Sequence, residues 1–188
     1  MLRRTVLLAT LALGACSTSL LPEPGPSASL PRDATNGAGD PLQSAIMNAA
    51  SSFGDTDRLA GRPELAARAL AQMEYITIEV PQNVRFTSDA SLASLQLVNA
   101  RREWRAALGI PESVPPQPVI NALFAAARAI EYGQGDPTSA LTSPIFSRGG
   151  AATLAQLRDL PPLPRTNGAA VAALDAMRKV EGTNRGRF

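Results

Sequence analysis

The sequence predicts an all-α fold, an irregular bundle of about five or six helices behind a disordered N-terminal tether. Three observations favour this class. Apolar residues recur every three or four positions through most of the chain after residue 42. Prolines and glycines fall mainly between these periodic stretches. Only one short segment alternates as a strand would.

The first helix is expected at residues 41–53. Asp40 can cap its N-terminus, and Pro41 suits the first turn because that position needs no backbone N–H. One face would carry the apolar residues Leu42, Ile46 and Ala49. We place the start of the folded domain, residues 42–182, at this element.

A longer helix is expected to start at Pro63. Its apolar residues recur at intervals of three or four and would form one stripe: Leu65, Ala69, Met73, Ile76 and Val80. Residues 73–80 also alternate like a half-buried strand, so an α+β fold with a short hairpin near 75–87 is the alternative. We favour the helix because a lone hairpin is marginally stable and no other segment supplies a third strand.

The best-formed helix is expected at residues 88–108, capped by Ser88 or Asp89 and ended by Gly109. Its apolar positions predict one broad buried face: Leu92, Leu95, Leu97, Val98, Trp104 and Leu108.

The same helix carries a basic cluster around the only tryptophan of the chain. Arg101, Arg102 and Arg105 flank Trp104. Guanidinium groups beside an aromatic ring are a candidate contact for an anionic group or a partner. The competing interpretation is that Trp104 packs in the core and the arginines lie along its rim.

The remaining chain continues the helical pattern. Residues 112–118 and 160–165 are rich in proline and are expected to be stiff connections. Helices are expected between and after them, at residues 119–132, 151–160 and 168–180. Residues 183–188 would form a basic C-terminal tail.

The N-terminus combines a short positive segment with a short apolar one. Arg3 and Arg4 precede nine uncharged residues, 5–13. A helix needs about 20 apolar residues to span a bilayer, so this stretch predicts an export signal. Gly14 and Ala15 are small enough to enter a peptidase cleft, and Cys16 supplies a thiol that a lipid can modify.

Leu13-Gly14-Ala15-Cys16 resembles the lipobox of bacterial lipoproteins that signal peptidase II processes. The resemblance implies removal of residues 1–15, lipid attachment at Cys16, and a membrane-anchored domain that faces the periplasm of the cell envelope. Ser17 replaces the Asp that retains some lipoproteins at the inner membrane, which slightly favours the outer membrane. The arginine pair also suggests a twin-arginine route, but its flanks match that motif only loosely.

Residues 16–41 are expected to be a lipidated cysteine followed by a disordered tether. The segment is rich in Pro, Gly, Ser and Ala and offers little to bury. Cys16 is the only cysteine, so the exported chain would contain no internal disulfide. The stability of the domain must then come from an apolar core.

The net charge of +2 belongs to the signal segment. Because Arg3 and Arg4 would leave with residues 1–15, basic and acidic residues become equal in number. A balanced charge gives no electrostatic basis for a nucleic-acid partner. The expected partners are the membrane, through the lipid on Cys16, and an unknown protein, lipid or polymer of the envelope.

The sequence offers few candidate catalytic residues. The chain contains no histidine, which excludes Ser-His-Asp sites and histidine-ligated zinc sites. No phosphate-binding glycine loop occurs, and the sequence predicts no cofactor, metal site or catalytic residue. Carboxylates remain, among them Glu74, Glu79, Glu103 and Glu131 on the expected helices. We therefore predict a noncatalytic binding domain, and the alternative is a small carboxylate-dependent enzyme acting on cell-wall glycan.

Overall fold

The computed structural model describes residues 27–34, 39–86 and 90–185. Within these ranges the chain forms six α-helices and three short 3-10 turns, with no strand, so the predicted all-α bundle is confirmed. The helices are α1 (Pro41–Gly54), α2 (Pro63–Glu79), α3 (Ala90–Leu108), α4 (Pro116–Tyr132), α5 (Gly150–Arg158) and α6 (Pro164–Arg185). No helix in the described ranges is both long and apolar enough to cross a membrane. The predicted signal segment and Cys16 lie outside the described residues.

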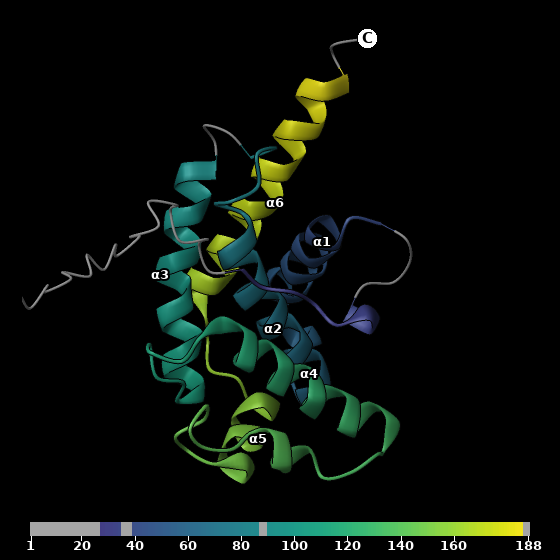
Figure 1. Cartoon of the computed structure of the whole chain (residues 1–188), viewed down its shortest axis with the longest axis vertical. Helices are drawn as coiled ribbons and strands as arrows, with labels where there is room; N and C mark the ends of the chain where they lie inside the picture. The colour runs from purple at the N-terminus through teal and green to yellow at the C-terminus, as the bar shows by residue number, and fades with distance from the viewer. Residues whose placement is uncertain (1–26, 35–38, 87–89, 186–188) are drawn as a thin grey trace, which may run out of the picture.

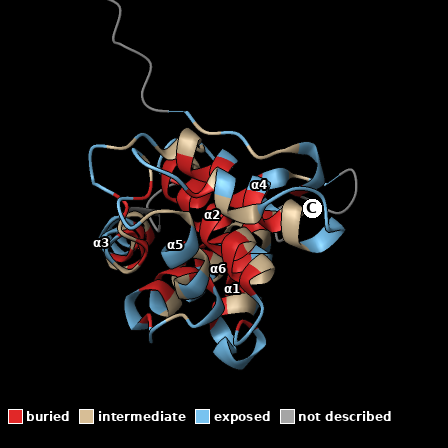
Figure 2. Ribbon diagram, turned by 90° about the horizontal axis from the view of Figure 1, so that it is seen from below, coloured by how far each residue is buried: buried red, intermediate tan, exposed pale blue. Residues whose placement is uncertain are grey.

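Helix α2 forms the centre of the bundle. It packs against α1, α3, α4 and α5, and Figure 2 shows it in the middle of the molecule, coloured almost entirely as buried. Thirteen of its 17 residues are buried, so neighbours cover it on every side and not along one stripe only.

The alternative of a hairpin near residues 75–87 was wrong. Residues 75–79 belong to α2, and the described part of the chain from there to residue 86 contains turns and a bend but no strand. The alternation of Ile76, Ile78 and Val80 resembles a half-buried strand, but in α2 the intervening residues Tyr75 and Thr77 are buried as well.

The capping residues predicted at two helix ends occupy those positions in the structure. The carboxylate of Asp40 accepts a hydrogen bond from the backbone N–H of Leu42 at 2.9 Å, and Pro41 occupies the first turn of α1. Gly109 ends α3 with a φ of 69°, a left-handed conformation that favours glycine. The predicted caps of α3, Ser88 and Asp89, lie outside the described residues.

Helix α3 lies on the outside of the bundle and runs beside α6 (Figure 1). Leu97, Trp104 and Leu108 are buried as predicted. The prediction was wrong for three residues, which are 65%, 63% and 46% exposed: Leu92, Leu95 and Val98. Helical periodicity puts them on the side of α3 opposite Leu97, Trp104 and Leu108, so α3 has one buried face and one partly apolar exposed face.

The helices α4 and α6 begin earlier than predicted, each at a proline. Helix α4 starts at Pro116 and α6 at Pro164, because proline is tolerated in a first turn, where no internal N–H bond is needed. Helix α6 also continues to Arg185, into the predicted tail, and its last turns project beyond the bundle in Figure 1.

Residues 27–34 lie against the helical domain and do not form part of a free tether. The backbone N–H of Ala28 donates to Glu79 Oε1 at 3.0 Å, and that of Ser29 donates to Gln117 Oε1 at 2.7 Å. Ala34 is buried at the end of a short 3-10 turn, Arg32–Ala34. The predicted disordered tether at 16–41 is corrected over residues 27–34, because polar side chains from α2 and α4 bind its backbone.

Candidate functional site

A buried carboxylate, Glu74, joins α2 to α3. Arg105 donates to its two oxygens from Nε at 2.7 Å and Nη2 at 2.9 Å. Arg101 Nε donates at 3.0 Å and Trp104 Nε1 at 2.9 Å. Glu74 and Trp104 are fully buried, and Arg105 is 3% exposed. We call these four residues the Glu74 network.

The Glu74 network also fixes the connection between α3 and α4. Nη1 of Arg105 donates to the backbone carbonyls of Pro111 at 3.1 Å and Val114 at 2.8 Å. A buried ion pair stabilises a fold only when its remaining hydrogen-bonding groups are satisfied as well. Here both carboxylate oxygens have at least two donors, so the network holds three parts of the chain together.

The structure therefore brings together three of the four residues of the predicted basic cluster. Arg101, Trp104 and Arg105 bind the chain's own carboxylate, while Arg102 is exposed and lies 3.6 Å from Glu112. An external anion at Arg101 or Arg105 would have to compete with Glu74. Contact of this cluster with an external group stays a prediction.

Glu103 caps a neighbouring helix. Its carboxylate accepts hydrogen bonds from the backbone N–H of Thr166 at 2.8 Å, the Thr166 hydroxyl at 2.7 Å and the N–H of Arg165 at 3.2 Å. These donors are in the first turn of α6, where backbone N–H groups lack partners within the helix. Glu103 therefore attaches the start of α6 to α3.

Burial also affects the single tyrosine of α2. Tyr75 is 8% exposed, and its burial, together with the nearby charges of Glu79 and Asp40, raises its pKa to about 12. The Tyr75 phenol therefore stays protonated at pH values above 10, the ordinary pKa of tyrosine.

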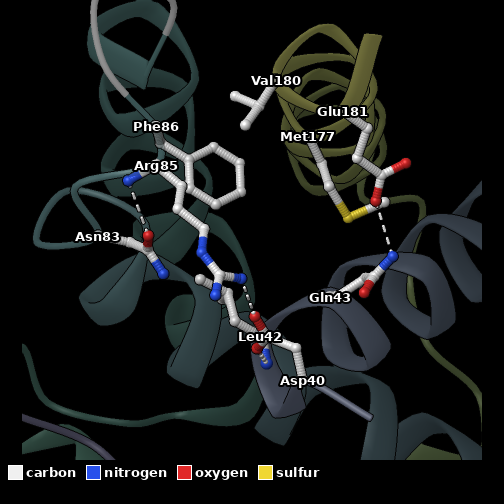
Figure 3. A pocket seen from close by; sticks show the side chains of 9 residues that line it. All are labelled: Asp40, Leu42, Gln43, Asn83, Arg85, Phe86, Met177, Val180 and Glu181. Carbon is white, nitrogen blue, oxygen red and sulfur yellow. Dashed lines mark hydrogen bonds and ion pairs between the residues drawn. The ribbon is translucent and has the colours of Figure 1, made fainter. Parts of the chain in front are cut away.

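A small apolar pocket lies between the start of α1, the α2–α3 connection and α6 (Figure 3). An ion pair of 2.8 Å between Arg85 and Asp40 borders one side, and a hydrogen bond of 2.7 Å from Gln43 to Glu181 borders the other. Its volume is about 130 Å³, below the roughly 300 Å³ at which small-molecule sites begin. The apolar lining consists of Leu42, Phe86, Met177 and Val180.

A larger cleft, which we call the Arg68 cleft, lies where residues 27–34 cross α1, α2 and α4. Its volume is about 360 Å³, within the range of small-molecule sites. Most of its lining is polar. The polar side chains are Asp33, Asn48, Ser51, Ser52, Arg68, Gln72, Glu131 and Tyr132, and the apolar ones are Ala34, Leu65 and Ala69.

The charges of the Arg68 cleft compensate one another. The guanidinium of Arg68 forms an ion pair with Glu131 and lies 3.9 Å from Asp33. Arg128 Nε lies 3.1 Å from the same oxygen of Asp33. Arg68 also stacks on the ring of Phe124, with 5.6 Å between the guanidinium carbon and the ring centroid. Arg128 lies beside the cleft and not in its lining, but it pairs with Asp33, so each carboxylate of the cleft has an arginine partner.

Gln72 is the most buried polar side chain in the cleft, at 4% exposure. Within the described part of the chain its amide makes one hydrogen bond, from Nε2 to the carbonyl of Ala34 at 3.4 Å, which is long. An amide side chain can make up to four hydrogen bonds. The cleft therefore contains a buried amide with unused hydrogen-bonding capacity.

Sequence reasoning named Glu131 but missed the cleft. Arg68 and Gln72 are four residues apart on α2, a spacing that puts them on one face, and this was the available signal. The rest of the site depends on the docking of residues 27–34, which their composition does not indicate.

The described residues offer no metal site, since no three Asp, Glu, His or Cys side chains among them gather closely enough to hold an ion. Comparisons of the chain with protein-family profiles, curated protein sequences and solved structures found no match.

Proposed function

We propose that this chain is a lipid-anchored lipoprotein of the cell envelope whose helical domain binds an envelope component without catalysing a reaction. The observation that carries the proposal is Leu13-Gly14-Ala15-Cys16 at the end of a short basic and apolar N-terminus. Acyl chains on Cys16 would supply the membrane affinity, because two chains anchor a protein stably where one is marginal. Ser17 slightly favours the outer membrane over the inner one.

The position of the described domain limits how far it can stand from the bilayer. Ser27, the first described residue, lies eleven positions after Cys16, with ten residues between them. At full extension such a segment spans at most about 40 Å. The proposed binding domain therefore acts close to the membrane surface.

The roles of the glutamates support a noncatalytic function. Glu74 binds two arginines and an indole N–H, Glu103 caps α6, and Glu79 accepts a hydrogen bond from the backbone of Ala28. Each of these three carboxylates has a structural partner, and none lines the Arg68 cleft.

The second candidate, a carboxylate-dependent enzyme acting on cell-wall glycan, draws on Asp33 and Glu131 in the Arg68 cleft. A general acid is usually desolvated in apolar surroundings. These two side chains are 37% and 42% exposed and form ion pairs with arginines, so we rank this function second. Release of soluble fragments from peptidoglycan by the wild-type chain, lost in Glu131→Gln, would reverse the ranking.

The anchoring is tested by metabolic labelling with a fatty acid, followed by membrane fractionation. We expect the wild-type chain to carry label and to sediment with membranes, and Cys16→Ser to do neither. Ser17→Ala is the matched control, because it alters the adjacent residue and keeps the thiol. Label and membrane retention in Cys16→Ser equal to those of the wild type would contradict the proposal.

A further inference from the structure

We propose that the Arg68 cleft binds an uncharged N-acetylated sugar, of the kind found in cell-wall glycan. The inference deepens the proposed function and rests on it for the compartment in which such a sugar occurs. The observations that carry it are the compensated charges of the cleft, its buried amide and its mixture of polar and apolar lining.

The charges of the cleft favour a neutral ligand. Arg68 contacts Glu131 and Asp33, and Arg128 contacts Asp33 as well. An anionic ligand would have to displace one of these carboxylates, and a cationic ligand would have to displace an arginine. A neutral ligand leaves all these ion pairs in place and can hydrogen-bond to their outer edges.

The polar groups of the cleft match hydroxyl and amide groups. A buried polar group normally has a hydrogen-bond partner, and among the described residues the amide of Gln72 has only the long bond to Ala34. Asn48 and Ser52 on α1 also line the cleft, and their side chains make no hydrogen bond to another described residue. Together these side chains offer donors and acceptors, as a sugar hydroxyl or an acetamido group requires.

The apolar groups of the cleft match the rest of such a sugar. Leu65 and Ala69 of α2 line it between the polar residues, and they would contact the methyl group of an acetamido substituent. Tyr132 lies at the end of α4 and is 58% exposed. An exposed aromatic ring with a hydroxyl has an apolar face for the C–H groups of a pyranose and a polar edge for its hydroxyls.

Isothermal titration of the full chain in detergent tests the inference, with the trimer of N-acetylglucosamine as the probe. We expect saturable binding by the wild type. Tyr132→Ala should weaken the affinity roughly tenfold and Asn48→Ala roughly fivefold, about the effect of one lost contact each. Asn99→Ala is the matched control, because Asn99 is also an exposed asparagine within a helix, on α3, and should leave the affinity unchanged.

Three results would overturn the inference: no binding of the trimer up to millimolar concentration, equal weakening by Asn48→Ala and Asn99→Ala, or displacement of the trimer by inorganic phosphate. Thermal melting of each variant excludes unfolding as the cause of a lost affinity. The titration does not depend on lipid at Cys16, so its failure and the failure of lipid labelling are distinguishable.

Discussion

Arginines and carboxylates meet in two regions of this molecule, and burial separates their roles. In the Glu74 network the carboxylate is fully buried, and three side chains donate to its two oxygens. In the Arg68 cleft the carboxylates of Asp33 and Glu131 are 37% and 42% exposed, beside the buried amide of Gln72, whose one hydrogen bond to a described residue is long. The same residue types therefore hold the fold together where they are enclosed and stay partly exposed to solvent in the cleft, where we propose that a ligand binds.

The largest effect is expected from Glu74→Gln. Removing the buried negative charge leaves Arg105 without its counter-ion, and breaking a buried pair in this way costs about 3–5 kcal/mol of unfolding free energy. Glu131→Gln is the matched control and should cost about 1 kcal/mol or less, because its ion pair is exposed. Urea unfolding measures both, and equal losses would remove the distinction between the two regions.

A pH titration compares Glu74, a buried group with cationic partners, with Tyr75, a buried group whose charged form is disfavoured. Tyr75 follows Glu74 on α2, and its burial, together with the nearby carboxylates of Glu79 and Asp40, raises its pKa to about 12. The folded state holds the phenol proton more tightly than the unfolded state, so this contribution to stability is complete below pH 10. It is lost as the pH rises toward 12, by about 1 kcal/mol at pH 11.

Urea unfolding at pH 8 and pH 11 checks this expectation. Tyr75→Phe should lose less stability between the two pH values than the wild type. Tyr132→Phe, which changes an exposed tyrosine, should lose as much as the wild type does. An unchanged pH dependence in Tyr75→Phe would contradict the assignment.

Glu103→Ala tests a carboxylate that binds backbone N–H groups and not arginines. Its loss leaves the first turn of α6 without an acceptor, and lost helix caps cost about 1 kcal/mol. Glu103→Gln keeps an oxygen in place and should recover part of that loss. Thermal unfolding measures both, and identical melting temperatures for Glu103→Ala and the wild type would show that the cap contributes nothing.

The smallest effect is expected from Leu95→Ser on the exposed face of α3. Leu95 is 63% exposed, so the change should alter the unfolding free energy by less than about 0.5 kcal/mol. Leu97→Ala, two residues away on the buried face, should cost roughly 2–5 kcal/mol. Comparable losses in urea unfolding would mean that both faces of α3 are covered in solution.

The sequence predicts the elements of this fold that depend on neighbouring residues. The cap at Asp40, the end of α3 at Gly109 and the helical nature of residues 63–79 follow from local pattern. The exposure of Leu95 could not be predicted in this way, because periodicity identifies apolar positions but not which of them a neighbouring helix covers.

The candidate site depends mostly on contacts between distant residues. Arg105 and Glu74 are 31 positions apart, and the nearness of Asp33 to Arg128 requires residues 27–34 to dock on the bundle. In the sequence, Glu74 is recognisable as a carboxylate on a helix and Arg105 as part of the basic cluster, each separately. Their pairing was not predictable, because charge pattern alone does not fix which helices meet.

The most direct test places a photoreactive amino acid at position 132, in place of Tyr132, in the full lipidated chain within its native envelope. The account predicts a crosslinked adduct that contains peptidoglycan and that decreases in mass after muramidase digestion. The same substitution at Val98, on the exposed face of α3, should give none. No adduct from position 132, or equal adducts from both positions, would contradict a glycan-binding cleft on a membrane-anchored domain.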